Sequence, residues 1–303
     1  MIPNVIGVDV GGTKILAGVV ERDGTVVTHR EYPTPLESEA ELLAGLEAAV
    51  RELLDESVGA VGFGIPSRID QRAGVAIGSV NIPLVDVPFR DVMHERLGLP
   101  VEIDNDANAA AIAEWKVGAG RGTTDMIMLT LGTGVGGGLI LGGRPYRGSI
   151  GAGGELGHLV IVHDGALCSC GGHGHLESYV SGKAADEVAR QEFGPAADAH
   201  RLVRLANEGD AKAIELLTEI GRKLGSGLGS LINVFDPQLI VVGGGFAAAG
   251  ELLFAPAREV MAREALKPMH DSIRVVRAEL GTSAGMIGAA MVAFDALDAA
   301  AAG

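Results

Sequence analysis

The sequence has little cysteine, little positive charge and no long uninterrupted apolar run. Only two cysteines occur in 303 residues, Cys168 and Cys170, and a single residue separates them. Two closely spaced thiols in a long chain fit a metal site in a reducing compartment better than the disulfide framework of a secreted domain. We therefore expect a cytoplasmic protein.

Basic residues are outnumbered by acidic ones. The chain has 24 Lys and Arg against 39 Asp and Glu, a formal net charge of −15. Such a charge balance disfavours nucleic acid and anionic membranes as partners. Any phosphate site must then be local and rely on backbone N–H groups, helix N-termini and a metal ion.

Apolar residues are plentiful but interrupted. No segment approaches an uninterrupted apolar span of about 20 residues, and the first residues enter a strand pattern without a charged leader, so we expect neither a membrane span nor a secretory signal. With 47% hydrophobic residues the chain can bury a large core, and its length suggests two lobes.

The most specific stretch lies between residues 155 and 177, where both cysteines occur among glycines. Four histidines flank them: His158, His163, His173 and His175. Thiolates and imidazoles are typical ligands of a four-coordinate Zn²⁺, and glycines allow a short loop to wrap the ion. A strained disulfide or two free thiols are the alternatives.

Three glycine-rich segments follow apolar strand patterns. They are Gly11, Gly12, Thr13 and Lys14 after residues 5–10; Gly132, Thr133 and Gly134 after residues 126–131; and Gly243, Gly244 and Gly245 after residues 239–242. Backbone N–H groups in such turns can cradle a phosphate, and Asp9, just before the first turn, can hold Mg²⁺ through water. A tight hairpin whose glycines need positive φ would look the same.

The first two segments share the order strand, glycine turn, strand. An apolar strand rather than a helix follows the second, which argues against a dinucleotide-binding fold. The recurrence predicts two related lobes with a nucleotide between them. This α/β pattern resembles the two-lobed actin/hexokinase-like (ribonuclease H-like) fold.

Residues 101–104 form a short strand pattern that feeds an alanine-rich helix through Trp115. Asp106, at this junction, could be the N-cap of the helix. Alternatively, it is a catalytic carboxylate with Asn105 and Asn108 as hydrogen-bonding neighbours, because α/β folds place catalytic groups at strand-to-helix junctions. Both interpretations can hold together.

Helical periodicity predicts helices over residues 39–54, 211–234 and 284–299. Gly221, Gly225 and Gly229 fall on one face of the second helix. Each glycine costs about 1 kcal/mol relative to alanine, so we expect close packing or a ligand on that face. A last strand is expected over residues 273–276.

Several of these motifs together resemble the ROK family (repressors, open reading frames and sugar kinases). They are DVGGTK, DNDANAAAIAE, LGTGVGGG, the stretch from Glu155 to Glu177, and DPQLIVVGGG, in the family's order. Where the family usually has a third cysteine, this chain has His175. The resemblance therefore implies His158, Cys168, Cys170 and His175 as zinc ligands, with His173 competing for the fourth place.

The resemblance also implies a function. It implies a small lobe over residues 1–115, completed by the C-terminal helix 288–303, and a large lobe over residues 116–287. The implied reaction is ATP-dependent phosphorylation of the 6-hydroxyl of glucose, with Mg²⁺ bound to ATP and a structural zinc. Asp106 resembles the catalytic base, and Asn105, Asp106, Glu155, His158 and Glu177 resemble the sugar ligands. Asp9 resembles the metal-facing carboxylate, and the three glycine segments resemble the nucleotide loops.

Three other functions fit the same resemblance less well. They are a kinase for another hexose such as fructose or N-acetylmannosamine, a polyphosphate-dependent glucokinase, and a sugar-sensing repressor. Polyphosphate would favour a basic track, which the net charge does not indicate, and a repressor would need a helix-turn-helix before the first strand. As a kinase, the chain is expected to form a homodimer or homotetramer.

Overall fold

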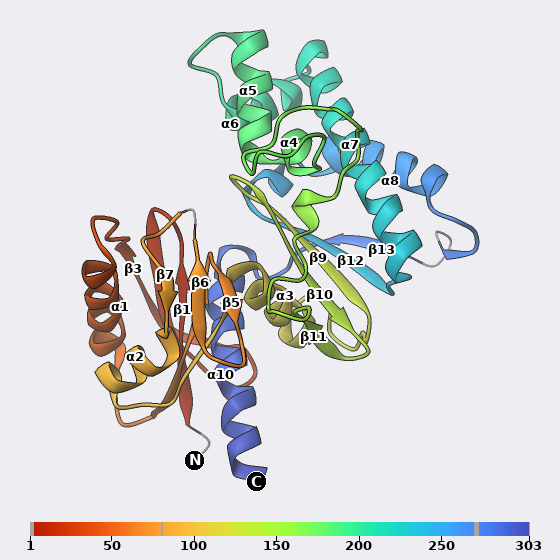
Figure 1. The fold of residues 1–303 in the computed structure, drawn as a ribbon. Helices are drawn as coiled ribbons and strands as arrows, with labels where there is room; N and C mark the ends of the chain where they lie inside the picture. The colour runs from red at the N-terminus through yellow and green to blue at the C-terminus, as the bar shows by residue number, and fades with distance from the viewer. Residues whose placement is uncertain (1–2, 80, 270–272, 303) are drawn as a thin grey trace. The chain divides into compact units, whose positions relative to one another are not determined.

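The structure is a computed structural model that describes residues 3–79, 81–269 and 273–302 (Figure 1). The chain divides into two compact units. Unit 1 comprises Met1–Gly122, Gly138–Gly154 and Glu279–Gly303, and unit 2 comprises Thr123–Gly137 and Glu155–Ala278. The lobe limits implied by the family resemblance stay a prediction, and each unit is described by itself.

The elements follow one another in an α/β order. Up to residue 122 they are β1 (Asn4–Val10), β2 (Lys14–Val20), β3 (Val26–Pro33), α1 (Glu39–Leu53), β4 (Val58–Ile65), β5 (Arg68–Asp70), β6 (Val75–Gly78), β7 (Val85–Val87), α2 (Phe89–Leu97), β8 (Val101–Asn105) and α3 (Asp106–Val117). After it they are β9 (Met126–Leu131), β10 (Val135–Leu141), β11 (Arg144–Tyr146), η1 (Leu156–His158), α4 (Glu177–Val180), α5 (Gly182–Phe193), α6 (Ala199–Asn207), α7 (Ala211–Phe235), β12 (Leu239–Gly243), η2 (Gly245–Ala249), α8 (Glu251–Glu264), β13 (Arg274–Arg277), η3 (Gly281–Ser283) and α10 (Ala284–Ala302).

Two five-stranded sheets repeat one topology. The first has the order β3-β2-β1-β4-β8, with an antiparallel β1–β2–β3 meander and with β4 parallel to both β1 and β8. The second has the order β11-β10-β9-β12-β13, with β12 parallel to both β9 and β13. Numbered within its own sheet, each order reads third, second, first, fourth, fifth. The recurrence seen in the sequence therefore corresponds to a repeated sheet.

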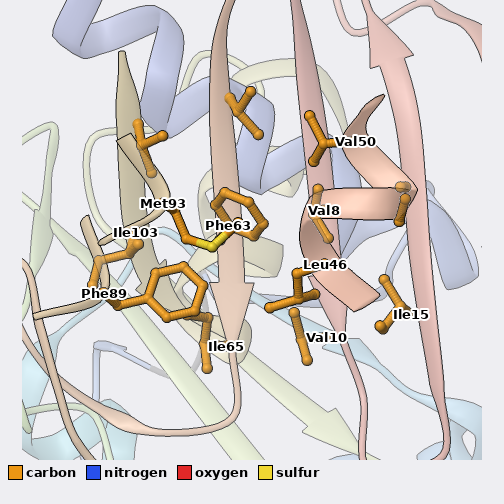
Figure 2. Close-up of a cluster of buried hydrophobic side chains, with 14 of the residues drawn as sticks. Val8, Val10, Ile15, Leu46, Val50, Phe63, Ile65, Phe89, Met93 and Ile103 are labelled. Carbon is orange, nitrogen blue, oxygen red and sulfur yellow. The ribbon is translucent and has the colours of Figure 1, made fainter. Parts of the chain in front are cut away.

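The core of unit 1 lies on one face of the first sheet (Figure 2). Alternate residues of a strand point to the same face, so Val8 and Phe63 meet Leu46 of α1 there. The rings of Phe63 and Phe89 pack edge to face, with centroids 5.1 Å apart. The amphipathic helix predicted over residues 39–54 is confirmed, and Ser38 caps it by accepting a hydrogen bond from the N–H of Glu41.

Glycines on the other face of this sheet admit α10. A Cβ on Gly7 would lie 2.0 Å from the carbonyl oxygen of Met286, and one on Gly62 would lie 1.8 Å from that of Ala289. Figure 1 shows α10, in blue, passing beside the strands of unit 1, and it also packs against α3. The C-terminal helix therefore belongs to the core of unit 1.

Among the residues that the structure describes, one helix, Gly281–Ala300, is long and apolar enough to cross a membrane by length and composition alone. This segment is not an uninterrupted apolar run, because Asp295 and Asp298 lie in it. Packing within the protein explains why this helix is apolar, because 61% of its most apolar 18-residue window is buried. A helix that packs closely on the glycines of a sheet and is covered on several sides needs apolar residues on most of its faces.

The glycine face of α7 is explained by packing in unit 2. A Cβ on Gly221 would lie 2.5 Å from the carbonyl oxygen of Leu253, and one on Gly225 would lie 2.3 Å from that of Ala257. Both partners belong to α8. The close packing expected for these glycines is thus confirmed, with a helix rather than a ligand as the neighbour.

Candidate active site and metal centre

Two aspartates lie near one another in unit 1, at the ends of parallel strands. Asp9 lies near the end of β1 and Asp106 directly follows β8. The pKa of Asp9 is raised from 3.8 to about 7, mainly by burial and next by the negative charge of Asp106, while the positive charge of Lys14 lowers it. A Cβ on Gly285 would lie 2.5 Å from the Asp9 carboxylate, so α10 needs a glycine there. The result is an acidic pair of the kind that binds a divalent cation or moves a proton.

Asn105, rather than Asp106, caps helix α3. The side-chain oxygen of Asn105 accepts hydrogen bonds from the N–H groups of Ala107 and Asn108, at 3.0 and 3.2 Å. Its amide nitrogen donates to the carbonyl oxygen of Ser67 at 3.3 Å. Asp106 is the first helical residue, and its Oδ1 accepts from the N–H of Ala107 at 2.9 Å. The capping role that was open for Asp106 therefore falls to its neighbour.

An ion pair that no sequence motif indicates supports this junction. Asp104 is 1% exposed and accepts two hydrogen bonds from Arg147, from Nε at 2.9 Å and from Nη2 at 2.6 Å. Its other oxygen accepts from the backbone N–H of Asn105 at 2.8 Å. Asp104 and Arg147 are thus functional candidates that local patterns did not reveal.

The first two glycine segments form turns with the same hydrogen-bond pattern. The N–H of Gly11 donates to the carbonyl oxygen of Lys14, and the N–H of Gly132 donates to that of Gly134. Gly11, Gly132 and Gly134 do not have positive φ. A tight hairpin that needs glycine for positive φ therefore does not explain the glycine at these three positions. Lys14 extends from the first turn and forms an exposed ion pair with Glu31 at 2.7 Å.

The second turn lies beside two further segments of unit 2. The N–H of Gly182, at the start of α5, donates to the carbonyl oxygen of Gly132 at 2.7 Å. Gly244 has φ of 87° and packs on the backbone of Leu131, where a Cβ would lie 2.4 Å from the carbonyl oxygen. The second and third glycine segments are therefore neighbours, with a helix N-terminus against them. The first three N–H groups of α5 donate to Gly132, Thr133 and Ser181, so they already have protein acceptors.

Four side chains of unit 2 converge in a group that could hold a metal ion. The candidate ligand atoms of His158, Cys168, Cys170 and His175 all lie within 4.8 Å of one another. Both cysteines are free thiols, so no disulfide forms between them. His173, the competing candidate, is exposed and not in the group.

The distances within this group fit a tetrahedral ion. Nδ1 of His158 and Nδ1 of His175 are 3.3 Å apart. Nδ1 of His158 is 3.8 Å from Sγ of Cys168, and Nδ1 of His175 is 3.3 Å from Sγ of Cys170. Zinc bonds of about 2.0–2.1 Å to nitrogen and about 2.3 Å to sulfur separate neighbouring ligand atoms by about 3.3–3.8 Å. The two-thiolate, two-imidazole set therefore suits Zn²⁺.

Glu177 connects the metal centre to the second glycine turn. Its Oε2 accepts from the backbone N–H of Val135 at 2.8 Å, directly after the turn. Its Oε1 accepts from the hydroxyl of Ser169 at 3.0 Å and lies 3.7 Å from Sγ of Cys168. Glu155 is exposed just before η1, and its carbonyl oxygen accepts from the N–H of His158. The predicted sites thus fall into two groups, one in each unit.

Comparison with known proteins assigns the family. The ROK family sequence model matches residues 5–296. The chain belongs to the ROK family. A glucokinase of Streptomyces coelicolor is 37% identical over an alignment of 309 positions, which covers 95% of this chain and 96% of that protein.

Solved ROK structures have the same fold. A ROK family glucokinase from Streptomyces griseus, in complex with glucose and AMPPNP, has a TM-score of 0.85 at 37% identity and covers 96% of this chain and 99% of its own. A ROK hexokinase from Thermus thermophilus has a TM-score of 0.84 at 38% identity and covers 98% and 99%. The family resemblance and the actin/hexokinase-like fold are confirmed.

The raised pKa of Asp9 predicts a pH-dependent stability. Between pH 3.8 and about 7 the folded state binds more protons at Asp9 than the unfolded state, so the free energy of unfolding falls as pH rises through this range. Above about 7 the carboxylate is ionised in both states and the loss is complete. In metal-free buffer, the free energy of unfolding of Asp9→Asn should not fall in this way. The variant should therefore become more stable relative to the wild type as the pH rises from about 4 to about 7.

Urea unfolding at several pH values tests this prediction. Asp86→Asn is the matched control, because Asp86 is exposed and has φ of 52°, which asparagine also tolerates. An Asp9→Asn curve that runs parallel to the wild-type curve over the whole range would contradict the buried-charge explanation.

Proposed function

We propose that this chain transfers the γ-phosphoryl group of ATP to the 6-hydroxyl of glucose. The observation that carries the proposal is the acidic pair of Asp9 and Asp106 at the carboxyl ends of parallel strands, in a chain whose relative was solved with glucose and AMPPNP. Phosphoryl transfer needs mainly an oriented hydroxyl, a base and charge neutralisation. In this proposal Asn105 orients the hydroxyl, Asp106 is the base, and Asp9 would hold the Mg²⁺ that neutralises charge.

Asp106 acts as the base in this proposal. Its carboxylate accepts the proton of the sugar hydroxyl while the oxygen attacks phosphorus. Asn105 is fixed by its capping bonds and by Ser67, so the second N–H of its side-chain amide is held in place to donate to a sugar hydroxyl. Glu155, His158 and Glu177 are the proposed sugar ligands of unit 2.

Asp9 and the glycine segments serve the nucleotide. Asp9 would hold Mg²⁺ through water, and bound Mg²⁺ would neutralise charge on the transferring phosphoryl group. The high pKa of Asp9 fits a carboxylate whose counter-ion arrives with its substrate. Residues 11–14, 132–134 and 243–245 are proposed to bind the phosphates and the nucleoside.

Zinc has a structural role in this proposal. His158, Cys168, Cys170 and His175 would hold it. Because Nδ1 of His158 faces the other ligands, its Nε2 is left to bond a sugar hydroxyl. Mg²⁺, ATP and zinc complete the expected cofactors, and the cytoplasmic location and the homodimer or homotetramer stay predictions.

Glucose is expected to be the preferred acceptor, ahead of fructose and N-acetylmannosamine. Carboxylates and an amide that are built to meet ring hydroxyls are left buried and unpaired when a sugar points a hydroxyl elsewhere, at about 1–3 kcal/mol per group. A coupled assay over a panel of sugars, with ATP or polyphosphate as donor, measures kcat/KM for each. A higher value for fructose or N-acetylmannosamine would defeat the assignment of glucose, and no activity with any sugar would defeat the kinase.

A further inference from the structure

Both carboxylate oxygens of Asp104 accept hydrogen bonds. Oδ2 receives both donors of Arg147, and Oδ1 receives the backbone N–H of Asn105 at 2.8 Å and the side-chain amide of Asn108 at 3.4 Å. Only arginine offers two parallel donors in a fixed plane. The pair therefore sets the orientation of Asp104 and, through it, the peptide that leads into Asp106.

Arg147 is itself fixed by the segment that carries it. Its carbonyl oxygen accepts from the N–H of Gly153 at 2.9 Å, which closes residues 147–153 into a loop. Gly151 of this loop packs on the backbone of Ile69, where a Cβ would lie 1.7 Å from the carbonyl oxygen. The chain then continues to Glu155, a proposed sugar ligand. One ion pair thus joins the segment before Glu155 to the junction that bears Asp106.

A purely stabilising role explains this pair poorly. Buried ion pairs often contribute no more to stability than apolar residues of similar size, because desolvation offsets their attraction. A second pair on the same strand gives a direct comparison. Glu102, two residues before Asp104, bonds Arg90 at 3.1 Å, and Arg90 and Arg147 have equally exposed side chains, 24% each. Only the Asp104 pair bonds the backbone at the junction.

We propose that Arg147 is a positioning residue for phosphoryl transfer, acting through its two-point bond to Asp104 on the direction of the Asn105–Asp106 junction. The proposal rests on the proposed kinase function. Its consequence is that Arg147 controls turnover more than nucleotide affinity. A displacement of about 1 Å at a catalytic group can cost up to about 10²-fold in rate.

The test compares Arg147→Lys with Arg90→Lys in the full-length protein. Lysine keeps the charge but cannot make the two-point bond. We expect Arg147→Lys to lower kcat by about 10- to 100-fold with KM for ATP within about 2-fold of wild type. Arg90→Lys should change kcat by less than about 2-fold. Thermal melting of both variants separates loss of fold from loss of positioning.

Asp104→Asn provides a second, independent variant. It should lower kcat like Arg147→Lys, and the double variant should fall no further than the lower single variant, because both changes break one interaction. The positioning role of Arg147 would be overturned by equal kcat for Arg147→Lys and Arg90→Lys, or by additive losses in the double variant. The proposed kinase function would still stand in that case if the wild type is active on glucose. A wild type inactive on every sugar would overturn both.

Discussion

Replacing Asp106 by asparagine is expected to lower kcat by at least about 10²-fold while the protein stays folded. The variant keeps the local structure, because Asn105 provides the cap and the side-chain oxygen of the new asparagine can still accept from the N–H of Ala107. It loses the negative charge with which Asp106 would accept a proton. A coupled assay for ADP release measures kcat, and circular dichroism measures the melting temperature.

Asp91→Asn is the matched control for this experiment. Asp91 lies in the first turn of α2 as Asp106 lies in the first turn of α3, so both substitutions remove one carboxylate from a helix N-terminus. That change costs about 0.3–1 kcal/mol of stability in either helix. Near-normal turnover in a folded Asp106→Asn variant would remove Asp106 from the catalytic role.

The same substitution has a measurable effect on Asp9. The negative charge of Asp106 contributes to the raised pKa of Asp9, so its removal should lower that pKa from about 7. Burial, the larger cause, remains, and the pKa should stay above the ordinary value of 3.8. The pH dependence of stability would then shift to lower pH, which connects the two aspartates by experiment.

Much of the fold could be predicted because its signals are local. The strand before Gly11 and the strand before Gly132 are short apolar runs that end in glycine turns, and each begins a sheet of the same order. Leucines at helical spacing predicted α1 to within one residue at its end. The alanine-rich run after Asp106 predicted α3 but not which residue caps it, since asparagine and aspartate are equally good caps.

The unpredicted features depend on residues far apart in the chain. Nothing near Arg147 indicates that it bonds Asp104, because the partner lies 43 residues away on β8 and arginine in a glycine-rich loop is usually solvated. Likewise the bond from Val135 to Glu177 joins the start of β10 to the start of α4, which lie 42 residues apart in the sequence. The pKa of Asp9 depends on burial beneath α10, at the opposite end of the chain.

The metal centre is the part of the site for which spacing and structure agree best. A Cys-x-Cys pair fixes two ligands on a short loop, and the isolated bridge between Val160 and His175 brings a third ligand back to it. His158 comes from η1. The sequence left His173 and His175 as alternatives because they are only two residues apart, and of the two only His175 lies in the four-residue group.

Cys170→Ser is expected to abolish stoichiometric zinc and most of the activity. Structural zinc contributes about 10–16 kcal/mol in zinc-finger peptides, so losing a thiolate ligand should release the ion or weaken its binding by orders of magnitude. Without the ion, four polar side chains would be left facing one another, and the loop over residues 158–175 should become sensitive to protease. Because Glu177 bonds both Ser169 of this loop and the N–H of Val135, KM for ATP should rise as well.

Metal analysis, limited proteolysis and kinetics on protein purified without added zinc test this expectation. His175→Ala should behave like Cys170→Ser, because His175 lies 3.3 Å from Cys170 within the four-residue group. His163→Ala and His173→Ala are the matched controls, since both histidines are exposed in the same loop and lie outside the group.

We expect one zinc per chain in the wild type and in both controls, and less than about a tenth of that in the ligand variants. Full activity in metal-free wild type would refute the structural role, and loss of zinc in His173→Ala with retention in His175→Ala would reassign the fourth ligand.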